Sequence, residues 1–158
     1  MAIPMYGQNK EGSVMNVFAD CLKLVEFDLT IAASSPADNA DTGYDIPANY
    51  MPLFSVVKNT GANALDAGAT YLDMETSETH LTGELNALAS GASQAMVIIN
   101  TLSADNTLDV SDSGSYTTAK NILVDGNMYS ASGTTLNVRI WCLDATALSG
   151  LDISSFPG

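Results

Sequence analysis

Basic residues are scarce in this chain. Five Lys and Arg stand against eighteen Asp and Glu, which gives a formal net charge of −13. Proteins that bind DNA or RNA neutralise phosphates with clustered Lys and Arg, whereas the basic residues here are scattered: Lys10, Lys23, Lys58, Lys120 and Arg139. The same shortage argues against anionic membrane surfaces. We therefore expect no nucleic-acid partner and no membrane partner, and a neutral or basic protein as the compatible partner.

Long apolar runs are also missing. The longest uninterrupted run covers residues 95–99, which is far shorter than the roughly 20 residues of a membrane-spanning helix. Residues 1–10 hold no apolar stretch after a basic start, so we expect no secretory signal. A protein of this kind that acts outside a cell would leave it by another route.

Cysteine is nearly absent. Cys21 and Cys142 are the only two and lie far apart in the sequence. They could form one disulfide between two strands, or remain two buried free thiols. The second interpretation is favoured, because a buried Cys behaves as a small hydrophobic residue. The pair does not indicate a redox compartment.

Catalytic and cofactor motifs are missing as well. His80 is the only histidine, and a general base or metal ligand needs partners that no second His or Cys supplies. We expect His80 at a surface loop or edge position. The sequence has no Gly-x-Ser-x-Gly motif and no glycine pattern that cradles phosphate. We therefore expect no catalytic residue, no cofactor and no enzyme activity, although the many carboxylates leave a glycosidase open by residue type alone.

Two acidic clusters raise the question of calcium. The first does not fit an EF-hand, because Gly43 and the acidic residues have the wrong spacing. Irregular calcium sites in sandwich loops stay open, but solvated turns are favoured because Asp and Asn prefer turns on their own account. We therefore assign no metal to either cluster: Asp38, Asn39, Asp41 and Asp45 form the first, and Asp105, Asp109 and Asp112 the second.

Short alternating segments make up most of the chain. Val25, Phe27, Leu29 and Ile31 alternate with polar residues, which predicts a strand with these four side chains inward. Residues 33–45 read as a polar loop, and Asp125-Gly126 as a tight turn between two strands. Six further segments read as strands and one as the last clear strand: 53–58, 70–75, 94–101 (nearly all apolar, so central), 107–111, 115–124 and 127–131, then 136–143.

This pattern predicts an all-β fold. A chain of 158 residues with 46% apolar residues is one globular domain by length and composition. About eight strands, with turn signals roughly every ten residues, predict a single antiparallel β-sandwich or a jelly-roll-like barrel. We expect an extended N-terminal arm at residues 1–12 and the domain at 13–158, including a C-terminal tail from residue 144. Residues 14–25 also carry helical spacing after Ser13, which fits one short N-terminal helix before the first strand.

Candidate interface residues lie in the arm and in the last strand. The arm holds an apolar cluster around a proline, Ile3, Pro4, Met5 and Tyr6, which can dock on a neighbour. Trp141 falls, by alternation, on the face opposite Leu136, Val138 and Ile140. A Trp on the outer face of a strand is either covered by another element or part of an interface. A platform for stacking sugars, with help from the tyrosines, is a smaller alternative.

Three segments carry a resemblance to known proteins: the start at 3–10 (IPMYGQNK), the approach to a strand at 40–49 (ADTGYDIPAN) and the close at 133–144 (GTTLNVRIWCLD). They resemble small accessory virion proteins of tailed bacteriophages, of the marine and cyanobacterial type. Together they cover about a fifth of the chain. The resemblance implies a β-sandwich on the capsid exterior that decorates or cements the shell. No catalytic residue carries over from this group.

The resemblance also implies the partners. We expect the major capsid protein and copies of this chain itself, as a homotrimer, with the apolar arm docked on the shell or on a neighbouring subunit. Other classes stay open: a phage tail, fibre or baseplate component, a carbohydrate-binding β-sandwich, and, least favoured, a small hydrolase.

Overall fold

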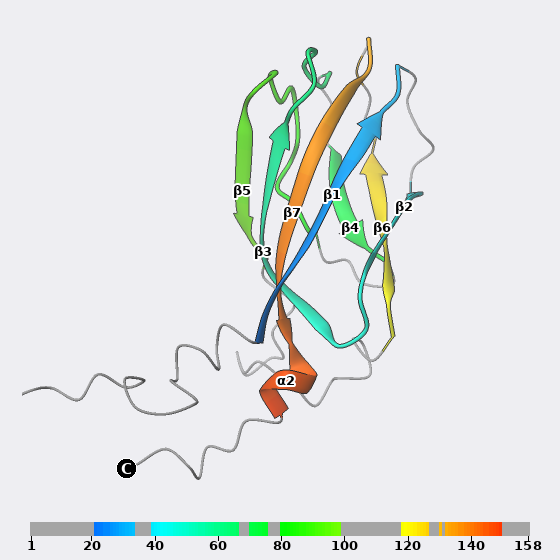
Figure 1. Ribbon diagram of the computed structural model, residues 1–158. Helices are drawn as coiled ribbons and strands as arrows, with labels where there is room; N and C mark the ends of the chain where they lie inside the picture. Colours follow the sequence, from blue (N-terminus) through cyan, green and yellow to red (C-terminus); the bar gives the residue numbers. More distant parts are fainter. Residues whose placement is uncertain are drawn as a thin grey trace, which may run out of the picture.

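Two antiparallel sheets packed face to face form the protein (Figure 1), as seen in a computed structural model that describes residues 21–33, 39–66, 70–75, 80–98, 118–126, 130 and 132–149. The predicted all-β sandwich is confirmed, and the two sheets do not close into a barrel. The predicted arm at 1–12, most of the expected helix and the expected strand at 107–111 lie outside the described residues. The strand that follows the expected helix begins at Leu22, three residues before its alternating pattern starts.

The larger sheet has four strands in the order β1-β7-β3-β5, and the smaller has three in the order β2-β6-β4. The strands of the larger sheet are β1 (Leu22–Ile31), β3 (Tyr50–Asn59), β5 (Ser93–Val97) and β7 (Thr134–Asp144). Those of the smaller sheet are β2 (Ala40–Ile46), β4 (Thr70–Met74) and β6 (Lys120–Gly126). One short helix, α2 (Ala145–Ser149), follows β7 directly.

The strands pair in a nested order. The first pairs with the last (β1 with β7), the second with the sixth (β2 with β6) and the third with the fifth (β3 with β5), all antiparallel. Every step along the chain from one described strand to the next changes sheet. This wrapped, nested pairing is the arrangement of a jelly roll, here with seven strands in the described part.

The nested order explains one wrong prediction. Asp125-Gly126 was expected to form a tight turn between two strands, but both residues belong to β6, where they pair with Tyr71 and Thr70 of β4. A tight turn joins neighbours in one sheet, whereas the chain after β6 returns to the other sheet.

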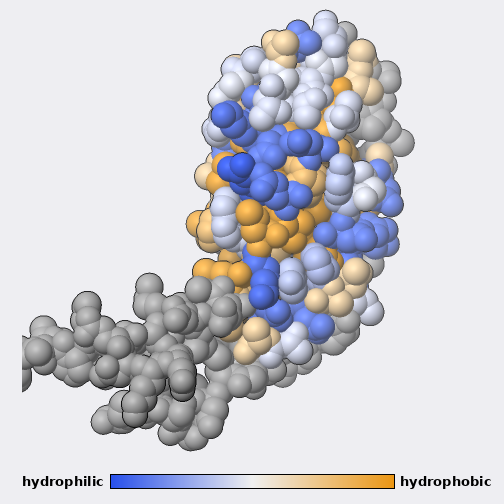
Figure 2. All heavy atoms as spheres, in the orientation of Figure 1, coloured by the Kyte–Doolittle hydropathy of each residue, from blue (hydrophilic) through white to orange (hydrophobic). Residues whose placement is uncertain are grey.

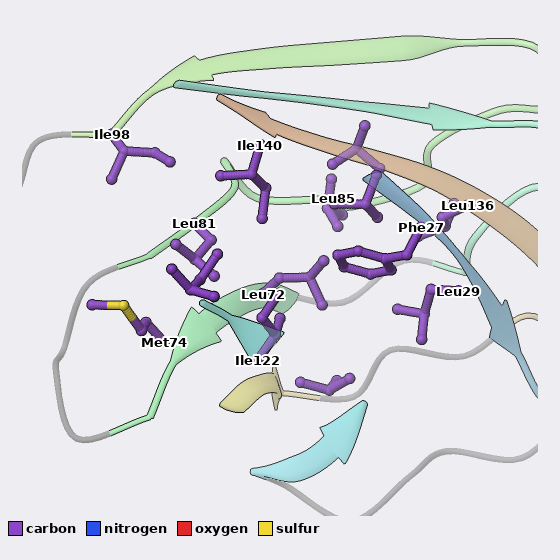
Figure 3. Close-up of a cluster of buried hydrophobic side chains, with 14 of the residues drawn as sticks. Phe27, Leu29, Leu72, Met74, Leu81, Leu85, Ile98, Ile122, Leu136 and Ile140 are labelled. Atoms are coloured by element: carbon purple, nitrogen blue, oxygen red, sulfur yellow. The ribbon is translucent and has the colours of Figure 1, made fainter. Parts of the chain in front are cut away.

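The core lies between the two sheets (Figure 3) and follows the alternation of the strands. On β7, the predicted inward face is confirmed, because four alternate side chains have no exposed surface: Leu136, Val138, Ile140 and Cys142. On β1, Phe27, Leu29 and Ile31 are buried as predicted, and Val25 packs partly against them. Leu72 and Met74 of β4 and Ile122 of β6 face them from the smaller sheet.

The predicted polar loop at 33–45 is wrong in its second half, where residues 40–46 form β2. The sequence of this strand has almost no apolar alternation, and only Ile46 at its end is buried. It lies at the edge of its sheet and pairs with β6 through a bulge between Asp41 and Asp45. Gly43 adopts a positive φ of 77° within the bulge, and the Thr42 hydroxyl donates to the Ile122 carbonyl oxygen at 2.7 Å.

The apolar run at 94–101 was expected to be a central strand, and this is wrong too. Its described part, β5, is five residues long and lies at the edge of the larger sheet, beside β3. The run divides at its end: Ile98 is buried in the core, while the Val97 side chain is 72% exposed. An unbroken apolar sequence therefore serves two different faces here.

A buried polar network closes one end of the sandwich. Asn59, at the end of β3, is fully buried and donates from Nδ2 to the carbonyl oxygens of Asn63 and Leu88. Its Oδ1 accepts from the Thr134 hydroxyl at 2.8 Å and from the Gly61 N–H at 3.1 Å. Gly61 has no room for a side chain, since a Cβ there would lie within 2.6 Å of the Thr135 nitrogen. The network joins the loop after β3 to the start of β7.

The end of β7 carries a helix cap. The Asp144 carboxylate accepts hydrogen bonds from the Thr146 hydroxyl at 2.8 Å and from the N–H groups of Thr146 and Ala147. This is the role of an N-cap residue, and it explains why α2, which was not predicted within the tail, starts here. The hydrogen bond from the Thr146 side chain is the main cause that lowers the pKa of Asp144.

Both cysteines are buried and free, as the favoured interpretation predicted. Cys142 faces the core from the centre of the larger sheet, and burial raises the pKa of its thiol from 9.0 to about 12. A thiol with such a pKa is neutral at pH 8 and therefore a poor nucleophile.

Replacing Thr134 by Val should lower the free energy of unfolding by about 1 kcal/mol, because Val keeps the shape but removes the buried hydroxyl that donates to Asn59 Oδ1. The midpoint of urea denaturation measures the change. The matched control is Thr30→Val on the exposed face of β1, which should change stability by less than about 0.5 kcal/mol. Equal shifts for the two variants would contradict a structural role for the network.

The folded protein should not react with a disulfide thiol reagent at pH 8, and both thiols should react after denaturation. Because the unfolded Cys142 thiol ionises near pH 9.0 and the folded one only near 12, its contribution to stability is complete below pH 9 and is lost as pH rises towards 12. Denaturation midpoints across that range test this. Rapid reaction of one thiol in the native protein would show that the burial is wrong.

Candidate interaction surface on the four-stranded sheet

The outer face of the four-stranded sheet carries most of the exposed large apolar side chains of the described part. Outward positions alternate with the buried ones along each strand, and the register between strands aligns them in rows. Leu24 of β1 pairs with Trp141 of β7, Trp141 with Phe54 of β3, and Phe54 with Val97 of β5. These four residues form an unbroken line from one edge of the sheet to the other, which we call the apolar row.

The apolar row is open to solvent. Leu24 is 47% exposed and Phe54 38%, and Val97 is the most exposed large apolar side chain in the described part. Trp141 is partly exposed and stacks on Phe54, with ring centroids 4.7 Å apart and an interplanar angle of 12°. Leu22, which is 44% exposed, pairs with Leu143 two positions further along the strands. This pair extends the apolar area beyond the apolar row towards the end of the sheet. At about 4.8 Å per strand, the row is about 14 Å wide.

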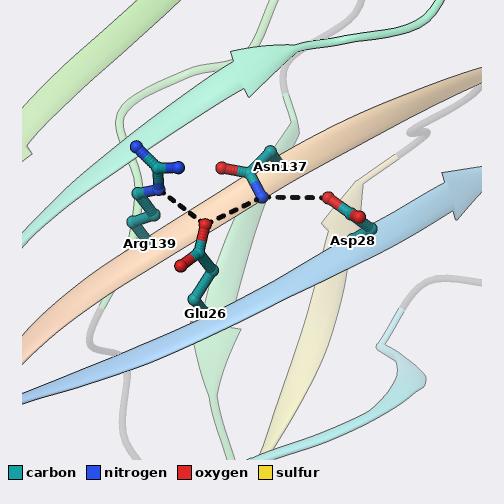
Figure 4. Close-up of polar contacts among 4 residues, drawn as sticks. All are labelled: Glu26, Asp28, Asn137 and Arg139. Atoms are coloured by element: carbon teal, nitrogen blue, oxygen red, sulfur yellow. Dashed lines mark hydrogen bonds and ion pairs between the residues drawn. The ribbon is translucent and has the colours of Figure 1, made fainter.

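The next row on this face is half polar, with Glu26 and Arg139 level with Val56 and Ala95, and the row after it is polar throughout. In the row next to the apolar one, Arg139 Nε donates to Glu26 Oε1 at 2.7 Å. Asn137 Nδ2 donates both to Glu26 Oε1 at 3.2 Å and to Asp28 Oδ1 at 2.9 Å, which joins two rows into one ladder (Figure 4). The hydrogen bond from Arg139 is the main cause that lowers the pKa of Glu26, and the one from Asn137 adds to it. In Figure 2 the blue polar cluster lies above an orange apolar area on this face.

The outer face is electrically balanced. Its outward positions hold two acids, Glu26 and Asp28 on β1, and two bases, Arg139 on β7 and Lys58 on β3. These charges cancel, whereas the whole chain carries −13. The surface is therefore a neutral, partly apolar area on an acidic protein.

Trp141 lies where the sequence placed it, on the outer face beside Asn137 and Arg139. The other candidate interface residues, Ile3, Pro4, Met5 and Tyr6, lie outside the described residues. Sequence reasoning missed Leu24, Phe54 and Val97 as parts of one surface. Each alternates correctly within its own strand, but only the register between strands, which joins distant segments, brings them together.

The three tyrosines of the described residues do not join Trp141. Tyr44 of β2 stacks on Phe27 at a centroid distance of 4.2 Å and donates its hydroxyl to the Asp28 carbonyl oxygen. Tyr50 packs partly against the core, and Tyr71 lies on β4 in the other sheet. Phe54 covers one face of the Trp141 ring, so that face is not free to stack on a sugar.

His80 occupies an exposed edge position, as expected. It forms a single bridge to Asp73 of β4, its Nδ1 lies 2.7 Å from Asp73 Oδ1, and its ring stacks on Tyr71 at 4.3 Å. A hydrogen bond of this kind orients the imidazole, and the stacking covers one face of the ring.

The acidic clusters form no metal site in the described part, where no group of three or more His, Cys, Asp or Glu side chains is placed to hold a metal ion. Of the first cluster, Asn39, Asp41 and Asp45 are described; Asp41 Oδ1 accepts from the Gly43 N–H at 2.8 Å and thereby shapes the bulge of β2. Asp38 and the second cluster, Asp105, Asp109 and Asp112, lie outside the described residues. Within that same part, no helix has the length and apolar character to cross a membrane.

The similarity of this chain to known proteins is low. No protein-family model matches the chain, and no curated protein matches it. A chain from the capsid of Ralstonia phage GP4 resembles it with a TM-score of 0.40 and 12% sequence identity, over 78% of this chain and 84% of that one. This chain is thus distantly similar in arrangement to one from a phage capsid.

Proposed function

We propose that this chain is a structural subunit of a tailed-phage virion, without enzyme activity, and that it decorates or cements the exterior of the capsid. The observation that carries the proposal is the apolar row on the four-stranded sheet. Exposed Phe, Leu and Val side chains and the partly exposed Trp141 lie in one contiguous area, bordered by hydrogen-bonded polar groups. This is the composition of a protein interface with an apolar centre and a polar rim. A surface of this kind supports a role in association with other protein chains.

The phage context of the proposal rests on the sequence. Two of the three segments that resemble small virion proteins are in the described part: residues 40–49 form β2 and the turn into β3, and residues 133–144 contain β7, which carries Trp141. The partners we propose are the major capsid protein and further copies of this chain. We assign attachment to the shell to the apolar arm, through Ile3, Pro4, Met5 and Tyr6.

Antibodies against the purified protein should label the heads of intact virions of the phage that encodes it. Because a decorating subunit repeats over the shell, quantitative mass spectrometry of purified particles should find hundreds of copies per particle. A few copies, or label confined to the tail, would support a tail, fibre or baseplate component instead. Absence from purified particles would contradict any virion role.

Removing residues 1–10 should abolish binding to particles stripped of the native protein, because it removes the apolar cluster of the arm. The urea midpoint and the far-ultraviolet circular dichroism of the shortened chain should match those of the full chain. Trp141→Ser in the full-length chain is the comparison variant, since it alters the sheet surface and leaves the arm intact. Undiminished binding by the shortened chain would contradict the role assigned to the arm, although not the virion role itself.

A further inference from the structure

We infer that the apolar row is covered by a second copy of this chain, so that two four-stranded sheets pack face to face about a twofold axis. The inference rests on the proposed structural role and deepens it by naming the partner of this surface. Where the sequence resemblance implies three copies, the geometry of this face points to two, because one self-complementary surface closes as a pair.

Charge is the first reason. A chain with a net charge of −13 repels its own copies over most of its surface. The outer face of the four-stranded sheet is different, because its two acids and two bases cancel. Copies can therefore approach each other on this face without the repulsion that opposes contact elsewhere.

The register supplies the second reason. The four strands lie in the order β1-β7-β3-β5, so a twofold axis parallel to the strands and midway between β7 and β3 places β7 over β3 of the second copy and β1 over its β5. Since the apolar row lies at one level across all four strands, Trp141 then faces Phe54 of the second copy. Leu24 faces Val97 of the second copy in the same way. The apolar row of one copy thus packs against the apolar row of the other.

The same rotation also matches the charges. Both acids of this face, Glu26 and Asp28, lie on β1, while Lys58 lies on β3, on the other side of the axis. Asp28 is level with Asn137, Lys58 and Ser93 across the sheet, so the axis places it over Ser93 of the second copy. Lys58 of that copy then lies one strand spacing away, about 4.8 Å sideways. Opposite charges thus come together twice, once on each side of the axis.

Packed sheets of two copies would resemble the packing inside the protein. Sheets that stack face to face lie about 10 Å apart with their strands within about 30° of each other. Side chains the size of Trp, Phe and Leu fill such a gap from both sides. The polar ladder of Glu26, Arg139, Asn137 and Asp28 would form the rim of the contact.

Trp141 is the only tryptophan of the chain, so its fluorescence reports on the centre of this surface alone. We expect the full-length protein to sediment with the mass of two copies at high concentration and of one copy after dilution. The Trp141 emission should shift to longer wavelength, and its quenching by acrylamide should increase, over the same dilution range. Sedimentation velocity and fluorescence on the same samples make the comparison.

Val97→Glu tests the contact without disturbing the fold, because this side chain is the most exposed of the row and lies on an edge strand. It places a carboxylate against Leu24 of the second copy, and the dissociation constant should rise at least about tenfold, because the contact would bury an unpaired charge. The matched control is Ala89→Glu, which adds the same charge at an exposed loop position and should change the constant less than about threefold.

Four outcomes would overturn the inference. A single-copy mass at every concentration with a readily quenched Trp141 would show a free surface, and the same mass with a shielded Trp141 would show cover by this chain's own residues. An assembly that Val97→Glu leaves intact would place the contact elsewhere, and a three-copy mass would exclude the twofold axis. None of these results bears on whether the protein is found on virions, so failure of the inference and failure of the proposed function are told apart.

Discussion

The register of β7 between β1 and β3 is the constraint on which the rest of the structure depends. Its inward side chains, from Leu136 to Cys142, have no exposed surface, and its outward ones carry Trp141 and the polar ladder. Because the side-chain period of a strand is two, a slip of one residue would exchange these faces and place Arg139 and Trp141 in the core. The same register therefore fixes the core and builds the outer surface.

The alternation of apolar and polar residues within each segment predicted much of this arrangement. The features that depend on pairing between distant strands could not be predicted in this way. The inward faces of β1, β4 and β7 follow from patterns within each segment, and so does the outward position of Trp141. The apolar row does not, because it joins segments that lie more than a hundred residues apart in the sequence, such as Leu24 and Trp141. β2 escaped prediction since an edge strand with one buried side chain carries no apolar alternation, and β5 was misplaced because its apolar run turns from the outer face to the core between Val97 and Ile98.

The outer face of the four-stranded sheet offers a partner two kinds of contact, apolar and charged. Burial of the apolar side chains against a partner is favourable. These side chains do not by themselves select the orientation in which the partner binds. The neighbouring ladder is hydrogen-bonded within the chain, so Glu26 and Asp28 each keep at least one hydrogen bond when a partner covers them. Charges of both signs at fixed positions then penalise wrong orientations more than they reward the right one.

The nested pairing of strands has a consequence for synthesis. Among the described strands, β1 pairs with β7 alone, so the first described strand of the chain must wait for its sheet partner until the last one has left the ribosome. Pairing between such distant segments requires closing long loops before any contact rewards it. Until that moment the backbone N–H and C=O groups of β1 have no strand to pair with, and the net charge of −13 opposes association between growing copies of the chain.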